Sequence, residues 1–319
     1  MAVYDVFNGD ADGICALAQL RNAEPQDSQL ITGVKRDIKL LAQVQPTSGD
    51  RVNALDISMD KNKADLLRIL ETGASVFYCD HHVAGDIPEH DRLDALINPA
   101  ADVCTSLLVN GRLKGAFAHW AIVGAFGDNL KASANALAKT TSLTEAQIAT
   151  LENFGIYINY NGYGSNLSDL HFEPAELFKL VSQYADPLDF IQDDAEHFGQ
   201  LEAGYHDDMA KAKNGETLRV TAASAAFLLP DEKWARRVSG VYGNDLANES
   251  PDRAHAVLTS RPDGTYLVSV RAPLRNKTGA DSLCMEFPTG GGRKAAAGIN
   301  ELPASMLDQF LDRFDEVYR

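Results

Sequence analysis

Residues 76–84 read VFYCDHHVA, an apolar run that ends abruptly on Asp80, His81 and His82. A short apolar run of this kind is typical of a strand in a parallel sheet that is covered on both faces. Ligands of open α/β sheets bind beyond the carboxyl ends of such strands. Two interpretations follow: a polar turn that contains two histidines, or a metal site at the end of a buried strand.

The sequence around this stretch alternates β-rich runs with helical patterns. Strands that alternate with helices at this spacing predict βαβ units and a parallel sheet between helical layers. The predicted fold class is therefore α/β for the N-terminal part of the chain. We expect strands over residues 4–7, 29–34, 51–58, 75–79 and 95–98, with helical patterns over residues 14–20, 39–44, 63–70 and 103–150.

The rest of the chain predicts a loop, a helical stretch and a change of fold class. Three glycines and five Asn or Ser residues in 155–170 indicate an ordered loop, and 173–213 is expected to be helical. After Gly215 the pattern becomes α+β, with a hairpin of strands 254–260 and 265–272 and a terminal helix over 305–314. We expect a catalytic domain over 1–189, a linker helix over 190–215 and a smaller α+β domain over 216–319.

Composition limits the class of protein. The 319 residues suit two domains, and the formal charge of −16 disfavours binding of long duplex nucleic acid, which depends on Lys and Arg. No apolar run approaches the ~20 residues of a membrane span, and a strand that begins near Val3 leaves no room for a signal peptide. The four cysteines show no CxxC spacing, so we expect a reduced, cytoplasmic protein that is a monomer or homodimer.

Acidic residues follow several of the predicted strands. Asp10 and Asp12 follow the first strand, Asp56 ends the third, and Asp128 closes an apolar helix over 116–126. Each acid alone is more often a helix cap or a turn residue. Their convergence with the Asp80-His81-His82 stretch would be unfavourable without cations, because like charges at short range resist burial. Carboxylates with imidazoles favour Mn²⁺, with Mg²⁺ as the alternative.

These motifs resemble a known family. DADG (10–13), ALDIS (54–58), CDHH (79–82) and FGDN (126–129) resemble the DHH family of phosphoesterases. GGGRKAAAGI (290–299) resembles the glycine-rich motif of the DHHA1 domain that accompanies it. The resemblance covers essentially the whole chain, with a GYG segment similar to the RecJ-like branch and a length similar to short-oligonucleotide and dinucleotide phosphodiesterases.

The resemblance implies a hydrolase with two metal ions, usually Mn²⁺, at a carboxylate-bridged site of the kind used for phosphoester hydrolysis. It implies that Asp56 bridges the ions, that His82 contacts the scissile phosphate and that Asp80 orients a ligand histidine. The residues that match metal ligands are Asp10, Asp12, Asp56, His81 and Asp128.

The sequence departs from the family pattern at two places. Many members have a His four residues before the first motif aspartate, and others an Asp two residues before it; these positions are Val6 and Asn8 here. Asn8 still offers a neutral oxygen as a possible sixth ligand, with weaker binding of the first metal. The glycine motif usually ends in His, where this chain has Arg293, a fixed and forked cation suited to phosphate.

A local basic segment predicts the substrate-binding part of the second domain. Residues 271–294 contain five cations and two acids, a net charge of +3 in an acidic chain. Backbone amides of a glycine run can bind an anion, although a tight turn with solvated cations would look the same. The residues expected to bind substrate are Arg271, Arg293, Lys294, Gly291 and Gly292.

The sequence therefore predicts an Mn²⁺-dependent phosphodiesterase that cuts short 5′-phosphorylated oligonucleotides to mononucleotides. Linear dinucleotides such as pGpG or pApA are the expected substrates. A 5′–3′ single-strand exonuclease and a cyclic-dinucleotide phosphodiesterase are the alternatives among enzymes. A nucleotide-binding regulator with impaired catalysis is the alternative of another class, because ligands are missing at positions 6 and 8.

Overall fold

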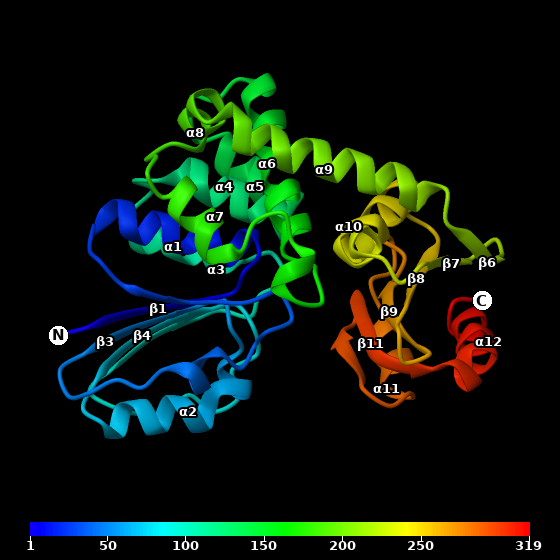
Figure 1. The fold of residues 1–319 in the computed structure, drawn as a ribbon, viewed down its shortest axis with the longest axis horizontal. Coiled ribbons are helices and arrows are strands. Elements are labelled where there is room, and N and C mark those ends of the chain that lie inside the picture. Colours follow the sequence, from blue (N-terminus) through cyan, green and yellow to red (C-terminus); the bar gives the residue numbers. More distant parts are fainter. The chain divides into compact units, whose positions relative to one another are not determined.

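A computed structural model describes residues 1–319 and divides the chain into two compact units, Met1–Ala203 and Gly204–Arg319 (Figure 1). Helix α9 (Ala195–Lys213) runs across this division. No helix has the length and apolar character that crossing a bilayer requires.

The first unit is built on a five-stranded sheet in which every neighbouring pair is parallel. The strand order is β2-β1-β3-β4-β5, so the predicted parallel sheet of an α/β fold is confirmed. The strands β1, β3 and β4 are buried along most of their length, as their apolar sequences predict. The strands are β1 (Val3–Phe7), β2 (Gln29–Ile31), β3 (Arg51–Leu55), β4 (Ser75–Asp80) and β5 (Leu93–Ile97).

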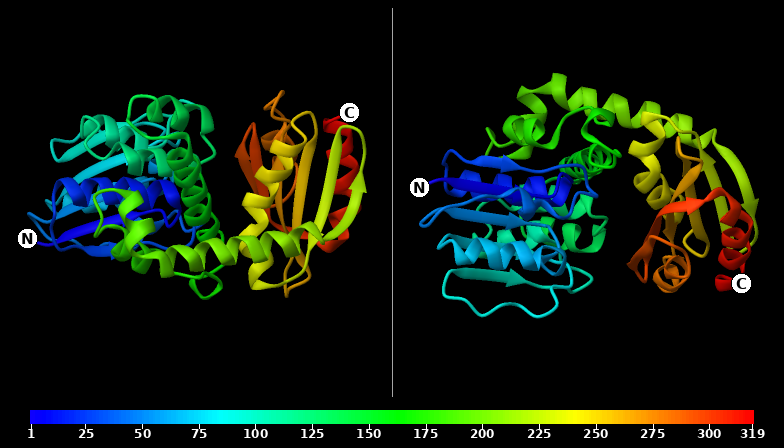
Figure 2. Two further views of the ribbon diagram at one scale, coloured as in Figure 1. Left: turned by 90° about the horizontal axis from the view of Figure 1, so that it is seen from above. Right: turned by 60° about the horizontal axis from the view of Figure 1, so that its bottom comes forward.

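Helices cover both faces of this sheet (Figures 1 and 2). Helix α2 (Met59–Glu71) packs one face, where its apolar side chains join those of β1, β3 and β4 in one core. Helix α1 (Ala11–Ala23) lies on the other face. The residues expected to be helical at 39–44 form a short 3-10 helix over Leu40–Gln43 instead. Further helices extend the layer of α1. The remaining helices of this layer are α3 (Thr105–Arg112), α4 (Ala118–Gly127), α5 (Lys131–Ala138), α6 (Glu145–Asn161), α7 (Pro174–Val181) and α8 (Pro187–Asp193).

The predicted loop over 155–170 is wrong in its first part, because α6 continues to Asn161. The last two turns of α6 are buried. Gly155 lets α6 approach the backbone of α4 closely, because a Cβ at Gly155 would lie 2.3 Å from the Val123 carbonyl oxygen. Packing against α4 therefore outweighs the weak helix preference of Gly and Asn. The helical stretch expected over 173–213 is confirmed as three helices, of which α7 and α8 each begin at a proline.

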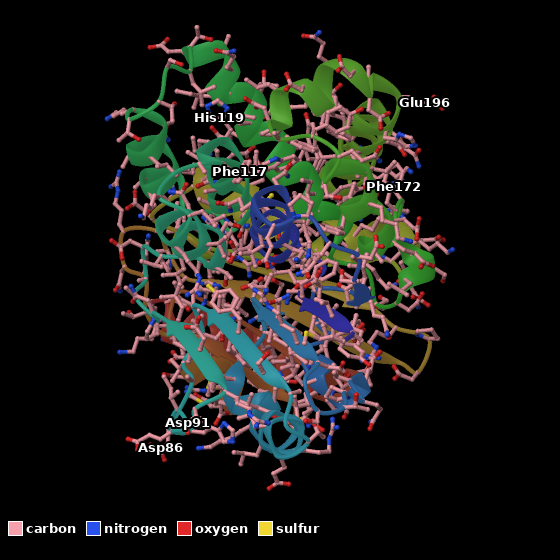
Figure 3. The ribbon with its side chains drawn as sticks, turned by 90° about the vertical axis from the view of Figure 1, so that its left-hand side faces the viewer. Asp86, Asp91, Phe117, His119, Phe172 and Glu196 are labelled. Carbon is pink, nitrogen blue, oxygen red and sulfur yellow. The ribbon has the colours of Figure 1, made fainter.

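Figure 3 shows this unit with its helical layer above the sheet and α2 below it. His119, labelled in the helical layer, lies 2.7 Å from Asp186 through its Nδ1 atom. This histidine therefore belongs to the helical scaffold and not to the ends of the strands.

The second unit is a mixed sheet of order β10-β11-β9-β8-β7-β6. The expected hairpin is confirmed as the antiparallel pair β8–β9, with Gly264 at φ 77° in its turn. Helix α10 (Lys233–Glu249) lies on one face, and α12 (Leu307–Val317) packs its phenylalanines into the core on the other (Figure 2). The other elements are α11 (Ala280–Met285), β6 (Glu216–Val220), β7 (Ser224–Leu229), β8 (Ala254–Ser260), β9 (Thr265–Arg271), β10 (Gly290–Arg293) and β11 (Ala296–Pro303).

Candidate metal centre

Two aspartates of the DADG motif are fixed by backbone amides at the starts of two helices. Asp10 is the N-cap of α1, and its Oδ1 accepts from the Asp12 and Gly13 amides at 3.0 and 3.1 Å. Asp12 reaches across to α3, where its oxygens accept from the amides of Thr105 and Ser106, both at 2.7 Å. Helix N-termini favour negative charge, so these contacts hold the carboxylates in place.

Asp56 follows β3 directly and adopts a left-handed backbone conformation, with φ 57°. Few residue types other than Gly tolerate this conformation, and Asp is one of those enriched there. Its amide donates to the Cys79 carbonyl, and its Oδ1 accepts from Thr105 Oγ1 at 3.1 Å. The turn therefore directs a buried carboxylate towards the ends of the strands.

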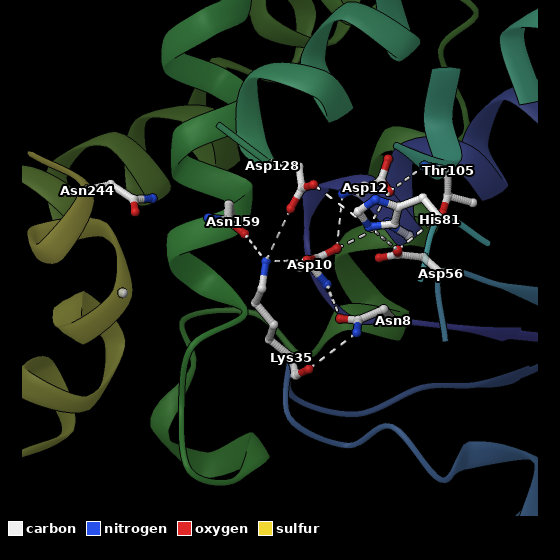
Figure 4. Close-up of polar contacts among 12 residues, drawn as sticks. Asn8, Asp10, Asp12, Lys35, Asp56, His81, Thr105, Asp128, Asn159 and Asn244 are labelled. Atoms are coloured by element: carbon white, nitrogen blue, oxygen red, sulfur yellow. Dashed lines mark hydrogen bonds and ion pairs between the residues drawn. The ribbon is translucent and has the colours of Figure 1, made fainter. Parts of the chain in front are cut away.

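His81 faces these carboxylates through one ring nitrogen (Figure 4). Its Nδ1 lies 3.0 Å from the Val103 carbonyl oxygen. A carbonyl can only accept, so Nδ1 carries the proton, and Nε2 is the ring nitrogen that can offer a lone pair to a metal. That Nε2 lies 3.4 Å from Asp56, 3.8 Å from Asp128 and 4.0 Å from Asp12.

Asp80 and His82 form a second contact beside this group. The buried Asp80 accepts from the His82 ring through Nδ1 at 2.7 Å and from the His81 amide at 2.9 Å. Asp80 therefore orients the ring of His82, whereas the ring of His81 is oriented by Val103. The side chain of His82 is 40% exposed, so it stands at the open side of the group.

The carboxylates form a strongly acidic cluster. Burial raises the pKa of Asp56 well above its ordinary value, and the charges of Asp12, Asp10, Asp80 and Asp128 raise it further. Such crowding is unfavourable without a cation. One imidazole nitrogen and the oxygens of Asp12, Asp56 and Asp128 form a donor set that suits Mn²⁺ or Mg²⁺. These residues fit the metal that the motifs imply.

Lys35 is a further member of this cluster, and no sequence motif had indicated it. Its Nζ lies 2.5 Å from Asp10 Oδ2, 2.9 Å from Asn159 Oδ1 and 4.0 Å from Asp128 Oδ1 (Figure 4). Burial lowers the pKa of Lys35, but the nearby charges of Asp10, Tyr163 and Asp128 outweigh it, and the pKa is raised. The same ammonium lowers the pKa of Asp10 against the effect of burial. The one available signal was the position of Lys35 just beyond β2, where ligands gather.

Asn8, the possible sixth ligand, makes two hydrogen bonds to nearby backbone groups. Its Oδ1 accepts from the Asp10 amide, and its Nδ2 donates to the Lys35 carbonyl, both at 3.2 Å. Asn8 therefore connects the loop after β1 to the backbone of Lys35. Val6 is fully buried in the apolar core beside α2 and offers no ligand atom.

The residues expected to bind substrate lie together in the second unit, but they differ in their surroundings. Arg293 and Lys294 are exposed at the end of β10, and a Cβ on Gly291 would meet open space. Gly292, at φ 144°, is required by its close approach to β11. Arg271 instead donates within its own unit, to Asn244, to Ser269 and to the carbonyl oxygens of Val270 and Gly240.

No protein-family model and no curated protein sequence matches this chain. Several solved structures do. The DHH domain of a member of a family of ribosomal proteins matches 99% of this chain and 86% of its own, with a TM-score of 0.69 and 12% identity. The structure of exonuclease RecJ bound to manganese matches 100% of this chain and 90% of its own, with a TM-score of 0.63 and 18% identity.

A third structure, the pGpG-specific phosphodiesterase PggH from Vibrio cholerae, matches 98% of both chains with a TM-score of 0.56 and 15% identity. At these identities the likeness is one of fold, and it extends over both units. The resemblance read from the motifs is thus confirmed, and this chain has the fold of the DHH-domain proteins.

Proposed function

We propose that this protein is a metal-dependent phosphodiesterase that hydrolyses short 5′-phosphorylated oligonucleotides to mononucleotides, with linear dinucleotides such as pGpG or pApA as its preferred substrates. The observation that carries the proposal is the convergence of His81 Nε2 with the carboxylates of Asp12, Asp56 and Asp128 within 4.0 Å. The fold, shared with an exonuclease and a pGpG phosphodiesterase, supports it.

Asp12, Asp56, His81 and Asp128 would hold the divalent cation, for which we propose Mn²⁺. When bound, such an ion supplies Lewis-acid stabilisation of phosphoryl charge and activation of water. The chain contributes the geometry: helix amides fix Asp12, a left-handed turn fixes Asp56, and Val103 sets the tautomer of His81. Such preorganisation removes much of the cost of arranging charges during the reaction.

His82 is proposed to donate a hydrogen bond to the scissile phosphate. Asp80 accepts from its Nδ1, which orients the ring. A protonated imidazole binds a phosphoryl oxygen and stabilises the negative charge that develops there. Asp80 is therefore a positioning residue, acting through the ring that it holds.

Arg293 and Lys294, with the open backbone at Gly291, are proposed to bind a phosphate of the substrate. Arg293 can bind phosphate through two parallel N–H groups. Arg271 shares the positive segment, but its contacts to Asn244 and Gly240 suit a role in positioning α10 against β9. We therefore expect Arg293→Ala to raise KM more than it lowers kcat, as the loss of a ground-state contact does. The matched control is Lys179→Ala, which removes an exposed cation on α7.

A substrate panel tests the function. Metal-free protein is supplied with Mn²⁺ or Mg²⁺ and given 5′-labelled pGpG, pApA, longer single strands and cyclic dinucleotides. We expect Mn²⁺-dependent release of mononucleotides, fastest from the linear dinucleotides. Faster cleavage of long strands would favour the exonuclease, and preference for cyclic substrates would favour the cyclic-dinucleotide phosphodiesterase. Tight nucleotide binding without hydrolysis would favour the regulator.

A further inference from the structure

We propose that the ammonium group of Lys35 takes the place of one of the two metal ions, so that the centre binds a single divalent cation. The proposal deepens the function given above and rests on its metal dependence. The single ion would lie on the His81 side of the cluster, among Asp12, Asp56 and Asp128. Lys35 would supply the positive charge on the Asp10 side.

The contacts of the ammonium are those of a cation site. Its Nζ is surrounded by oxygens of Asp10, Asn159 and Asp128, at 2.5, 2.9 and 4.0 Å. Asp10 thus faces the ammonium with Oδ2, while its Oδ1 accepts from two backbone amides of α1. Asp128 faces both sides of the cluster, with Oδ1 towards Lys35 and Oδ2 towards His81. The two positive positions thus share one carboxylate, as paired ions do.

Lys35 is held at this position from its backbone outwards. Its amide donates to the Gly162 carbonyl at 2.8 Å, and its carbonyl accepts from Asn8 at 3.2 Å. The Nζ lies 5.2 Å from the centre of the Tyr163 ring, a cation–π contact. Asn159 and Gly162 belong to the C-terminal end of α6, which attracts positive charge. The side chain is only 23% exposed, so it is part of the packed structure.

The neighbouring residues lack the ligands that a second ion would need. Val6 is buried in the apolar core, and both polar atoms of Asn8 are used in the loop that carries Lys35. A divalent ion placed between Asp10 and Asp128 would also lie beside an ammonium, and the repulsion between these charges is strong in a partly buried site. The Asp10 side of the cluster thus lacks metal ligands and already holds an ammonium group. Both features point to a single bound metal ion.

Metal stoichiometry tests the proposal without depending on activity. Metal-free protein is titrated with Mn²⁺, and binding is followed by calorimetry and by electron paramagnetic resonance. Wild type should bind about one Mn²⁺ per chain and show the spectrum of an isolated ion. Lys35→Ala should bind about two, with the spectrum of an exchange-coupled pair. Lys39→Ala, which removes an exposed cation from the same segment, should behave as wild type.

Adding Asn8→Asp to Lys35→Ala should tighten binding of the second ion by about tenfold, because it restores an acidic group beside Asp10.

Two Mn²⁺ ions bound as a coupled pair in wild type would overturn the proposal, whether or not the variants fold. The absence of a second ion from both Lys35 variants would overturn it as well. One ion per chain without phosphodiester hydrolysis would leave this inference standing and reject the proposed function instead. Hydrolysis by wild type with two bound ions would reject this inference and leave the proposed function standing.

Discussion

Asp56 combines a demanding backbone conformation with an unfavourable charge. Its φ of 57° suits Asp and Asn but few other residues. The side chain is buried among other carboxylates, and this burial raises its pKa well above the ordinary range. A folded pKa above the unfolded value means stability that is present in acid and lost as the pH rises. In the absence of metal, the Asp56 carboxylate therefore destabilises the folded protein at neutral pH.

Asp56→Asn should stabilise the metal-free protein and abolish its response to Mn²⁺. Asn tolerates the left-handed turn and removes one charge from the cluster, so unfolding without metal should cost about 1–2 kcal/mol more than in wild type. The stabilisation by Mn²⁺ and the hydrolysis should both be lost, because the amide is a poor ligand at a central position. Thermal unfolding with and without Mn²⁺ measures both effects.

The matched control is Asp60→Asn, which removes an exposed carboxylate from the first turn of α2. It should leave the Mn²⁺-induced rise in Tm unchanged. A metal-free Asp56→Asn protein that is less stable than wild type would show that charge repulsion at this site is not the dominant effect.

His255 gives a separate prediction in the second unit. Burial lowers its pKa to about 4, and the charge of Arg253 contributes. The unfolded chain takes up this proton near pH 6.5 and the folded chain only near pH 4, so the free energy of unfolding should fall as the pH drops through that window. In His255→Gln this fall should be smaller by on the order of 2–3 kcal/mol. Denaturant unfolding at several pH values checks it, and parallel curves for the two proteins would contradict it.

At the scale of elements, glycines let α4 pack closely against α1 and α6, and this packing positions the site. A Cβ on Gly127 would lie 2.3 Å from the Ala11 Cβ of α1, and one on Gly155 would lie 2.3 Å from the Val123 carbonyl oxygen of α4. Asp128 follows Gly127 directly at the end of α4, and Asn159 lies one turn after Gly155 on α6. The distance between these helices therefore sets the positions of two polar groups in the cluster.

Gly155→Ala should destabilise the protein by about 1–3 kcal/mol, because the new methyl group meets backbone atoms that cannot rotate away. Mn²⁺ affinity should fall too, since the displaced backbone at Gly127 carries Asp128. Gly199→Ala on α9 is the matched control: its Cβ meets open space, and the change should stabilise the helix by about 0.5–1 kcal/mol. Equal stabilities of the two variants in urea would contradict this account of the packing.

At the scale of the whole molecule, charge sets the expected length of the substrate. The chain carries a net charge of −16, and the basic segment over residues 271–294 has a net charge of only +3. Such a segment can neutralise few phosphates. Nucleotides beyond the first two or three would add repulsion from the acidic surface and few new contacts.

We therefore expect kcat/KM to fall from dinucleotide to pentamer. Added salt should improve the longer substrates relative to the dinucleotide, because it screens their repulsion. An exonuclease that follows a long strand through a basic groove would gain with length and lose with salt. Kinetics on a ladder of about two to ten nucleotides at two salt concentrations distinguishes these cases. A ten-mer that is the better substrate at low salt would reject the dinucleotide preference.

Local patterns in the sequence were enough to predict the parallel sheet and the group of acids at its end. Buried strands appear as apolar runs, and parallel strands place their carboxyl ends on one edge, so these patterns predict that Asp56 and His81 meet. Helix α6 was harder to predict, because its glycine and asparagines favour a loop locally and only packing against α4 makes them helical.

The charges that complete the centre depend on tertiary packing alone. Lys35 lies 25 residues from Asp10 and 124 from Asn159, and no local pattern connects them. The same holds for the carbonyl that fixes the His81 tautomer and for the contacts that occupy Arg271. A motif identifies the residues that carry the chemistry, whereas the partners that set their charge and orientation come from distant segments brought together by packing.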